Sequence, residues 1–223
     1  MTDRKERPSY TVHRAADFSY DPPDARPWAS IPPLAVDRYL WLENGYRPRV
    51  EARLCWSTRF LYVRFRVEEK RVRVRYTKFQ DPVYKDSCVE FFVDMFPAKR
   101  LGYVNFEMNA AGTLLAAFGP DRNRRTPLWP EDLAGLAVDA MIPGPVDGEY
   151  GADAWTLEYR VPTGLFRSLY DEDISPGHRA AANFYKCGDE TDVPHYGAWS
   201  PVGTPSPDFH RPEFFGELVF SKE

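Results

Sequence analysis

Short runs of alternating apolar and polar residues recur along this chain of 223 residues, and they constrain the fold more than any other feature. A period of two is typical of β-strands, because successive side chains point to opposite faces of a sheet. No strand–helix–strand alternation appears, and residues 161–169, containing Pro162 and Thr163, form the one convincing short helix. The chain therefore predicts an all-β fold, an antiparallel β-sandwich of about eight to ten strands. The runs are rich in β-branched and aromatic residues and comprise 51–56, 59–69, 87–95, 103–119, 136–142, 154–162, 179–188 and 216–221.

The composition favours one domain over the whole chain, 1–223, with its core at about 30–220. Hydrophobic residues make up 43% and aromatic residues 15%, which is enough for a packed core. The 21 prolines cluster between the strand runs, and proline lacks the donor that a sheet ladder needs, so these segments predict long loops. Residues Asn109 to Gly112 predict a tight turn between two strands.

Charge and cysteine usage exclude several classes of protein. The net charge is −4 and no large basic block occurs, so nucleic acid is not an expected partner. No apolar run resembles a membrane span or a secretory signal, which predicts a cytoplasmic protein, or a secreted one if a signal has been removed. Cys55, Cys88 and Cys187 are odd in number and lack metal-ligand spacing, so we expect reduced core residues. The oligomeric state is left open.

Each predicted strand divides into an apolar row and a polar row. In 87–95, Val89, Phe91, Val93 and Met95 form the row expected in the core, while Glu90 lies in the other row. Such a row is either a solvated outer face or, if loops cover it, a cleft with fixed hydrogen-bonding groups. The polar rows of four other strands contain Arg64, Arg66, Glu107, Asn109, Glu158, Arg160, Asn183 and Tyr185.

A sugar is a ligand that such a cleft would suit. Its hydroxyl groups need donors and acceptors, and its C–H faces need a flat aromatic platform. Tyr84, Trp129 and Trp199 lie in predicted loops and are candidate platforms, or lids over the core. His195 and His210 could each bond a sugar hydroxyl or fix the loop in which they lie. The strand context of Trp56 and Trp155 favours the core.

Six ordered blocks of the sequence resemble the family-9 carbohydrate-binding modules and family-9-like proteins. The most specific blocks are Asp-Ser-x-Val-Glu at 86–90, Phe-Glu-x-Asn-x-x-Gly at 106–112, and the run from Trp-Ser-Pro at 199–201 to Phe-His-x-Pro-x-x-Phe-Gly at 209–216. The resemblance covers roughly residues 30–220.

This resemblance implies an immunoglobulin-like, DOMON-like sandwich that holds a sugar between two aromatic rings on one sheet. It implies binding of the reducing end of glucan or xylan chains, and structural calcium. Carried over by motif, the site residues are Trp199, Glu90 and Asn183. Tyr84 is the aromatic residue nearest to the position of the family's second ring. Glu107 and Tyr185 stand where the family has an Arg and a Gln. Possible oxygen ligands for calcium are Asp86, Asp94, Asp189, Glu190 and Asp192.

Three functions follow from these observations. The first is non-catalytic binding of an oligo- or polysaccharide in carbohydrate catabolism, because no recognisable catalytic motif is present. Trp199 and Tyr84 would stack on the sugar, and hydrogen bonds would come from Glu90, Glu107, Asn109, Asn183 and Arg64. The second is a glycosidase-like or sugar-modifying enzyme with Glu90 and Glu107 as paired carboxylates. The third is a haem-binding redox module, which is disfavoured because Met95 and Met108 fall in core rows and no Cys-x-x-Cys-His motif exists.

Overall fold

The structure of this chain, a computed structural model, describes residues 7–19, 26–141, 148–151 and 154–222. Strands dominate it, with one α-helix, α1 (Thr163–Tyr170), and short 3₁₀ turns. The strands are β1 (Ser9–Arg14), β2 (Leu34–Ala35), β3 (Arg38–Tyr39), β4 (Arg49–Trp56), β5 (Phe60–Glu68), β6 (Arg71–Val74), β7 (Cys88–Asp94), β8 (Tyr103–Asn109), β9 (Leu114–Gly119), β10 (Thr126–Pro127), β11 (Ala137–Met141), β12 (Gly148–Gly151), β13 (Trp155–Pro162), β14 (Arg179–Cys187), β15 (Tyr196–Ala198) and β16 (Gly216–Phe220).

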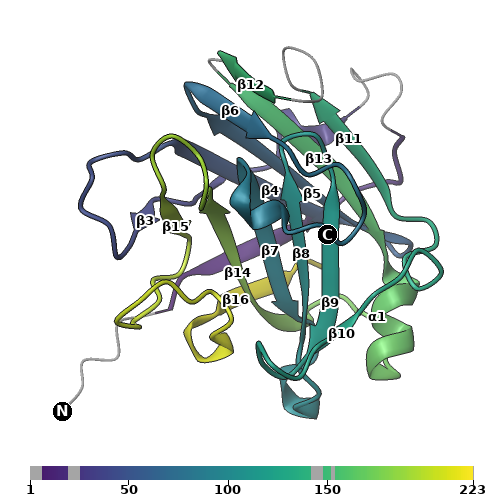
Figure 1. Cartoon of the computed structure of the whole chain (residues 1–223). Helices are drawn as coiled ribbons and strands as arrows, with labels where there is room; N and C mark the ends of the chain where they lie inside the picture. Colours follow the sequence, from purple (N-terminus) through teal and green to yellow (C-terminus); the bar gives the residue numbers. More distant parts are fainter. Residues whose placement is uncertain (1–6, 20–25, 142–147, 152–153, 223) are drawn as a thin grey trace.

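Most of these strands form one curled sheet in which β1 joins two halves (Figure 1). One half has the order β10-β9-β8-β7-β14-β16, and the other has the order β4-β5-β13-β11. The first part of β1 pairs in parallel with β16, and its last two residues pair in parallel with β4. The all-β prediction is therefore confirmed, but the sheet is mixed rather than wholly antiparallel.

The main core lies inside the curl, where the apolar rows of the two halves meet. The predicted core row of β7, Val89, Phe91 and Val93, is buried there, and so are Trp56 and Trp155, as expected. The predicted helix is also confirmed as α1, which follows β13 directly. Its last residue, Tyr170, donates a hydrogen bond from its hydroxyl to the carbonyl of Gly102, so the helix closes one end of the core.

The predicted turn between β8 and β9 is present. The amide of Gly112 donates to the carbonyl of Asn109 at 2.9 Å, and Gly112 has φ +81°, a conformation that glycine adopts without strain. This turn fixes the register of β8 against β9. The polar residues of β8 therefore keep a defined position beside those of β7.

Two smaller apolar clusters lie on the outer faces of the sheet. One, with Phe92, Tyr185 and Phe209, forms where the C-terminal loops cover β7, β8 and β14. The other, with Trp28 and Tyr62, forms where the segment before β2 covers β4 and β5. Loops therefore cover outer faces that the strand pattern alone would leave to solvent. No helix in the described part of the chain is long and apolar enough to cross a membrane.

Candidate ligand-binding site

The polar rows of the strands lie on two different faces of the molecule. β5 and β13 belong to one half of the sheet, where the Glu158 carboxylate lies 2.9 Å from Arg26 Nη1 and 3.3 Å from Arg64 Nε. Trp28 Nε1 donates to the same carboxylate at 2.8 Å. β7, β8 and β14 belong to the other half. Arg64 therefore does not share a face with the strands that carry Glu90 and Glu107.

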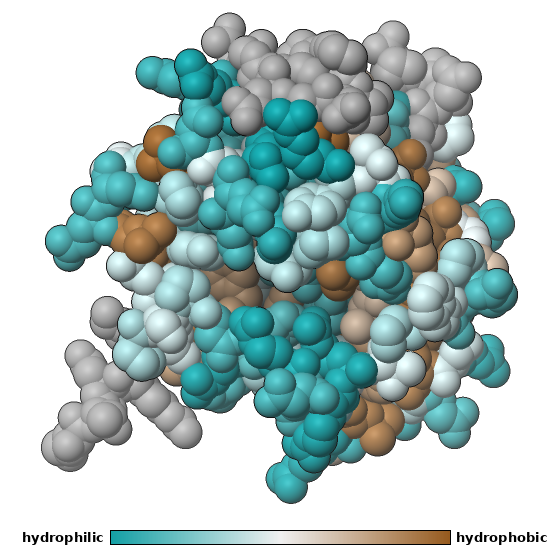
Figure 2. Space-filling model, in the orientation of Figure 1, coloured by the Kyte–Doolittle hydropathy of each residue, from teal (hydrophilic) through white to brown (hydrophobic). Residues whose placement is uncertain are grey.

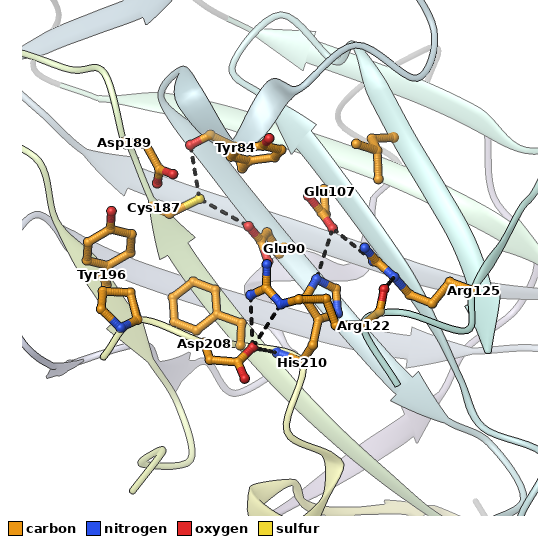
Figure 3. A pocket seen from close by; sticks show the side chains of 13 residues that line it. Tyr84, Glu90, Glu107, Arg122, Arg125, Cys187, Asp189, Tyr196, Asp208 and His210 are labelled. Atoms are coloured by element: carbon orange, nitrogen blue, oxygen red, sulfur yellow. Dashed lines mark hydrogen bonds and ion pairs between the residues drawn. The ribbon is translucent and has the colours of Figure 1, made fainter. Parts of the chain in front are cut away.

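A cavity of about 330 Å³ lies over β7, β8 and β14 and beneath the loops that follow β9 and β15 (Figure 3). Figure 2 shows this side of the molecule in the orientation of Figure 1. The surface is mainly hydrophilic, and hydrophobic residues are visible in a recess between polar ones. The cavity thus combines a polar wall with apolar patches, as small-molecule sites commonly do. It is lined by Tyr84, Glu90, Glu107, Leu115, Arg122, Arg125, Cys187, Asp189, Tyr196, Pro207, Asp208, Phe209 and His210.

Glu90 and Glu107 form the floor of this cavity. They are directly opposite one another on the antiparallel strands β7 and β8, and their exposed fractions are only 3% and 4%. Asn105 Nδ2 donates to Glu107 Oε1 at 3.0 Å. The thiol of Cys187 donates to Glu90 Oε1 at 3.1 Å. Two carboxyl groups therefore face one small cavity from adjacent strands (Figure 3).

Burial changes the protonation of this pair. It raises the pKa of Glu90 well above its ordinary value, and the nearby charge of Glu107 adds to the effect. Burial also raises the pKa of Glu107 to about 7, although Arg125 and Arg122 oppose the rise. Near neutral pH the floor therefore holds fewer than two full negative charges, and it can both donate and accept hydrogen bonds.

Two arginines from the segment between β9 and β10 form part of the cavity wall. Arg122 donates from Nε and Nη2 to Asp208 Oδ1 at 3.2 and 2.8 Å, which ties this segment to the C-terminal loop. Arg125 Nη1 lies 3.8 Å from Glu107 Oε1, too far for a hydrogen bond. This atom is buried and has no hydrogen-bond partner among the described residues. It is a donor available to a ligand.

The remaining polar groups of the wall are a histidine and an aspartate. His210 Nδ1 and the hydroxyl of Tyr103 are 2.8 Å apart. Burial and, to a smaller extent, the charges of Arg125 and Arg122 together lower the pKa of His210 to about 2, so the ring stays neutral. On the opposite side, burial raises the pKa of Asp189, which shares a hydrogen bond with Tyr196.

Aromatic rings stand at three places around the cavity. Tyr84 and Tyr196 are half-buried, whereas Phe209 is buried and stacks on Tyr185 with ring centroids 4.0 Å apart. Tyrosine presents both a flat apolar face and a hydroxyl group. The cavity therefore has partly exposed aromatic faces next to charged hydrogen-bonding groups.

Only Tyr84, Glu90 and Glu107 of the predicted ligand-binding residues line this cavity. Trp199 is 8% exposed and packs in the main core, where its ring is perpendicular to that of Phe184 at 5.7 Å. Trp129 is 52% exposed and lies against Phe79. The expected pair of rings, Trp199 and Tyr84, is therefore not brought together around the cavity.

The other predicted polar residues are buried and bonded to the protein itself. Asn183 donates to the carbonyl of Ser200, Tyr185 to that of Phe209, and Asn109 to that of Tyr76. These contacts hold loops against the sheet. His195 is buried with Lys186 and Glu69: its Nε2 lies 2.8 Å from Lys186 Nζ, and burial lowers its pKa to about 2. His195 therefore lies outside the cavity.

The sequence pattern did not identify Arg122, Arg125, Tyr196 and Asp208 as site residues, and it indicated Asp189 only as a calcium ligand. All of them except Tyr196, the first residue of the short strand β15, lie in loops, where no periodic pattern indicates which way a side chain points. One signal was available, since Arg122, Asn123, Arg124 and Arg125 form a dense group of planar hydrogen-bonding side chains directly after a predicted strand.

The carboxylates considered for calcium do not form an oxygen cage in the described part of the chain. Asp86 Oδ2 accepts hydrogen bonds from the amides of Arg75 and Tyr76 and from Asn109. Glu190 is paired with Arg73 and Lys85. Among the described residues, the group of His, Cys, Asp and Glu side chains close enough to share an ion is Cys88, Glu90 and Cys187, which is not the all-oxygen set that calcium prefers.

Comparisons with known proteins agree with this fold. The sequence profile of the family described as Carbohydrate-binding family 9 matches residues 24–220. A protein from Bacteroides uniformis ATCC 8492, provisionally described as carbohydrate-binding, is 30% identical, with a TM-score of 0.85 and coverage of 97% of this chain and 100% of that one. A comparison with curated proteins found no match.

Two further solved structures are of a family-9 carbohydrate-binding module from Caldicellulosiruptor kristjanssonii, at 13% identity. The complex with cellotriose has a TM-score of 0.62 and covers 97% of this chain and 95% of that one. The complex with glucose has a TM-score of 0.61 and covers 97% of each. At this identity the likeness concerns the fold.

Proposed function

The chain belongs to carbohydrate-binding family 9, and we propose that it binds the end of a glucan- or xylan-type oligosaccharide, without catalysis, in the cavity over β7, β8 and β14. The cavity volume of about 330 Å³ lies at the small end of the range for ligand pockets, roughly 300–1,000 Å³. It suits the terminus of a sugar chain better than a long stretch of it.

The observation that carries this proposal is the carboxyl pair beside an arginine whose donor has no hydrogen-bond partner in the described part of the chain. Glu90 and Glu107 supply donors and acceptors from the floor, and Arg125 Nη1 supplies a donor from the wall. A sugar hydroxyl both donates and accepts, so adjacent groups of these kinds match it. Tyr84 and Tyr196 offer faces on which a pyranose ring can stack.

The similar solved structures support the same function. The Bacteroides uniformis protein is provisionally described as carbohydrate-binding, and the Caldicellulosiruptor module was solved with cellotriose and with glucose. We also propose that the curled sheet is a DOMON-like, immunoglobulin-like sandwich. The packing of two apolar strand rows against each other in the main core supports that assignment.

Calorimetric titration tests the proposed ligand. Purified protein is titrated with glucose, cellobiose, xylobiose and the corresponding alditols, first with calcium and then with a chelator. We expect heat of binding with at least one free sugar, and a loss of that heat for the alditol if the cavity recognises the reducing end. A folded protein that gives no heat with any of these sugars would refute the assignment.

Variants locate the site within the molecule. Arg125→Met and Tyr196→Ala should each weaken sugar binding by about five- to tenfold, since each removes a hydrogen bond or a stacking face, worth about 1–1.5 kcal/mol. Trp129→Ala is the matched control, because this exposed aromatic residue does not line the cavity. If Trp129→Ala abolished binding while Arg125→Met did not, the ligand would lie elsewhere.

An enzymatic function is a second candidate, because Glu90 and Glu107 are a carboxyl pair whose pKa values are both raised by burial. Residues directly opposite in antiparallel strands have Cβ atoms about 4.5–5.5 Å apart, which is compatible with the spacing of retaining glycosidases. Incubation with aryl glycosides tests this candidate. Turnover by the wild-type protein that disappears in Glu107→Gln would favour an enzyme. If the wild-type protein shows no turnover, this candidate is excluded.

A further inference from the structure

The cavity floor contains three potential metal ligands that sequence spacing did not reveal. Cys88 and Cys187 are directly opposite one another on β7 and β14. Glu90 is two residues after Cys88, so both side chains point to the same face of β7. The two thiol sulfurs and a carboxylate oxygen of Glu90 all lie within 4.8 Å of one another. Ligands nearly one hundred residues apart in sequence are thus gathered by strand pairing.

The hydrogen bonding of Glu90 is unusually poor for a buried acid. Its one hydrogen bond with a described residue comes from the Cys187 thiol, a weak donor. Glu158, by comparison, is paired with two arginines and accepts from the indole of Trp28. Glu69 is paired with Lys186 and accepts from the indole of Trp155. A buried carboxyl group without a strong partner is costly, and a bound cation would remove that cost.

We propose that Cys88, Cys187 and Glu90 bind a zinc-class divalent cation through two sulfurs and one oxygen. Zinc accepts both cysteine sulfur and carboxylate oxygen, whereas calcium and magnesium prefer all-oxygen sets. Three protein ligands leave a fourth tetrahedral position open, as in zinc sites that take water or an exchangeable ligand. That position faces the cavity, because Glu90 and Cys187 both line it.

Cys55 provides a contrast within the same chain. It is also buried, but it lies on β4 in the other half of the sheet, in the cluster with Trp28 and Tyr62. It is not part of the three-ligand group. A Cys55→Ser variant therefore loses one buried thiol without touching the proposed site.

Cobalt binding tests the proposal and does not depend on any sugar. The reduced, metal-free protein is titrated with Co²⁺, which reports thiolate ligation and tetrahedral geometry by its absorption, and the cobalt is then displaced with Zn²⁺. We expect one equivalent to bind with thiolate-to-cobalt charge-transfer bands.

Variants separate this site from adventitious binding. Cys88→Ser, Cys187→Ser and Glu90→Gln should each weaken Zn²⁺ binding by at least about 100-fold. Losing a residue that only supports a metal ligand already costs about 10- to 100-fold in affinity, and these residues are the ligands themselves. Cys55→Ser should bind like the wild-type protein. Thermal unfolding with and without Zn²⁺ serves as a second readout, because metal should raise the Tm of wild-type and Cys55→Ser protein but not that of Cys88→Ser.

Three outcomes would overturn the proposal. They are no saturable Co²⁺ binding by the reduced protein, binding without charge-transfer bands, and equal loss of binding in Cys55→Ser and Cys88→Ser. Sugar titrations of the chelator-treated protein are evaluated separately. A failure of the metal site is therefore distinguishable from a failure of carbohydrate binding.

Discussion

At the scale of single residues, buried charges have very different surroundings in the two halves of the sheet. Glu158 lies in a closed cluster with Arg26, Arg64 and Trp28, all of which are provided by the chain. Glu90 and Glu107 face a cavity instead, and the nearby Arg125 has an atom without a hydrogen-bond partner among the described residues. In the first arrangement the carboxylate is paired with two arginines and an indole, whereas in the second the two carboxyl groups and Arg125 face a cavity.

The Glu158 cluster predicts a stability effect without a binding effect. Glu158→Gln should lower the free energy of unfolding by about 3 kcal/mol, because it leaves the buried guanidinium of Arg26 and the half-buried guanidinium of Arg64 facing a neutral amide. Asp139→Asn is the control: its partner is also Arg26, but its side chain is 31% exposed, so we expect less than half that loss. Urea unfolding measures both. Equal losses would show that burial does not determine the effect.

The neutral state of His210 predicts a pH dependence of stability. Its pKa is lowered to about 2 in the folded protein, against an ordinary value of 6.5. The unfolded chain therefore binds a proton below pH 6.5 that the folded protein does not. The stability contributed by the neutral ring is fully present above pH 6.5 and is lost as the pH falls, by about 1.4 kcal/mol per pH unit.

His210→Gln isolates this contribution. Glu107, Asp208, Arg122 and Arg125 also lie around the ring and carry their own charges, so the wild-type pH profile contains more than one group. Comparing urea unfolding at pH 7.5 and pH 5.5 in both proteins removes most of these shared effects. The wild-type protein should lose about 1 kcal/mol more than the variant over this interval. Parallel pH profiles would contradict the prediction.

At the scale of elements, β1 determines whether the two halves of the sheet act together. Val12 has an exposed fraction of 0% and lies in the main core, and it is paired with Phe220 of β16. Val12→Ala should lower the free energy of unfolding by about 2 kcal/mol, through lost burial and a residual cavity. Thr11→Ala, on the exposed side of the same strand, should cost less than about 0.5 kcal/mol. Urea unfolding of both variants decides whether β1 is a structural strand.

Strand patterns explain which elements were predictable. The apolar rows of β7, β8 and β13 repeat over six residues or more, so alternation identified them and their core side chains. β1 has the same alternation, with Tyr10 and Val12 buried between more exposed residues, but its run is short and follows a charged segment. Its parallel partners are distant in sequence, so local pattern could not reveal that it joins the halves.

At the scale of the whole molecule, the candidate site was harder to predict than the fold. Glu90 and Glu107 drew attention because a carboxylate within a strand row is unusual, and both line the cavity. Arg125 and Tyr196 were not identified, because their positions depend on how loops cross the outer face. Trp199 shows the opposite difficulty: its loop position suggested a platform, yet its ring packs into the main core. Loop direction depends on tertiary contacts that periodicity does not encode.

A shared core predicts one cooperative unit. Residues of both halves contact one another in a single main cluster, and β1 pairs with strands of each half. Thermal unfolding followed by calorimetry and by tryptophan fluorescence should therefore give one coincident transition. Two separable transitions would instead indicate that the halves fold as independent domains.

The pairing of β1 with β16 also has a consequence for how the chain reaches its native state. Ser9 is paired with Glu217, so the first strand of the described chain needs the last one as its partner. During synthesis on the ribosome, β1 and β4 emerge long before β16, and the sheet cannot close until nearly the whole chain is available. Such distant contacts slow folding, because a long loop must close before they form. We therefore expect late folding, with strand edges exposed until β16 arrives, and dependence on chaperones that protect them.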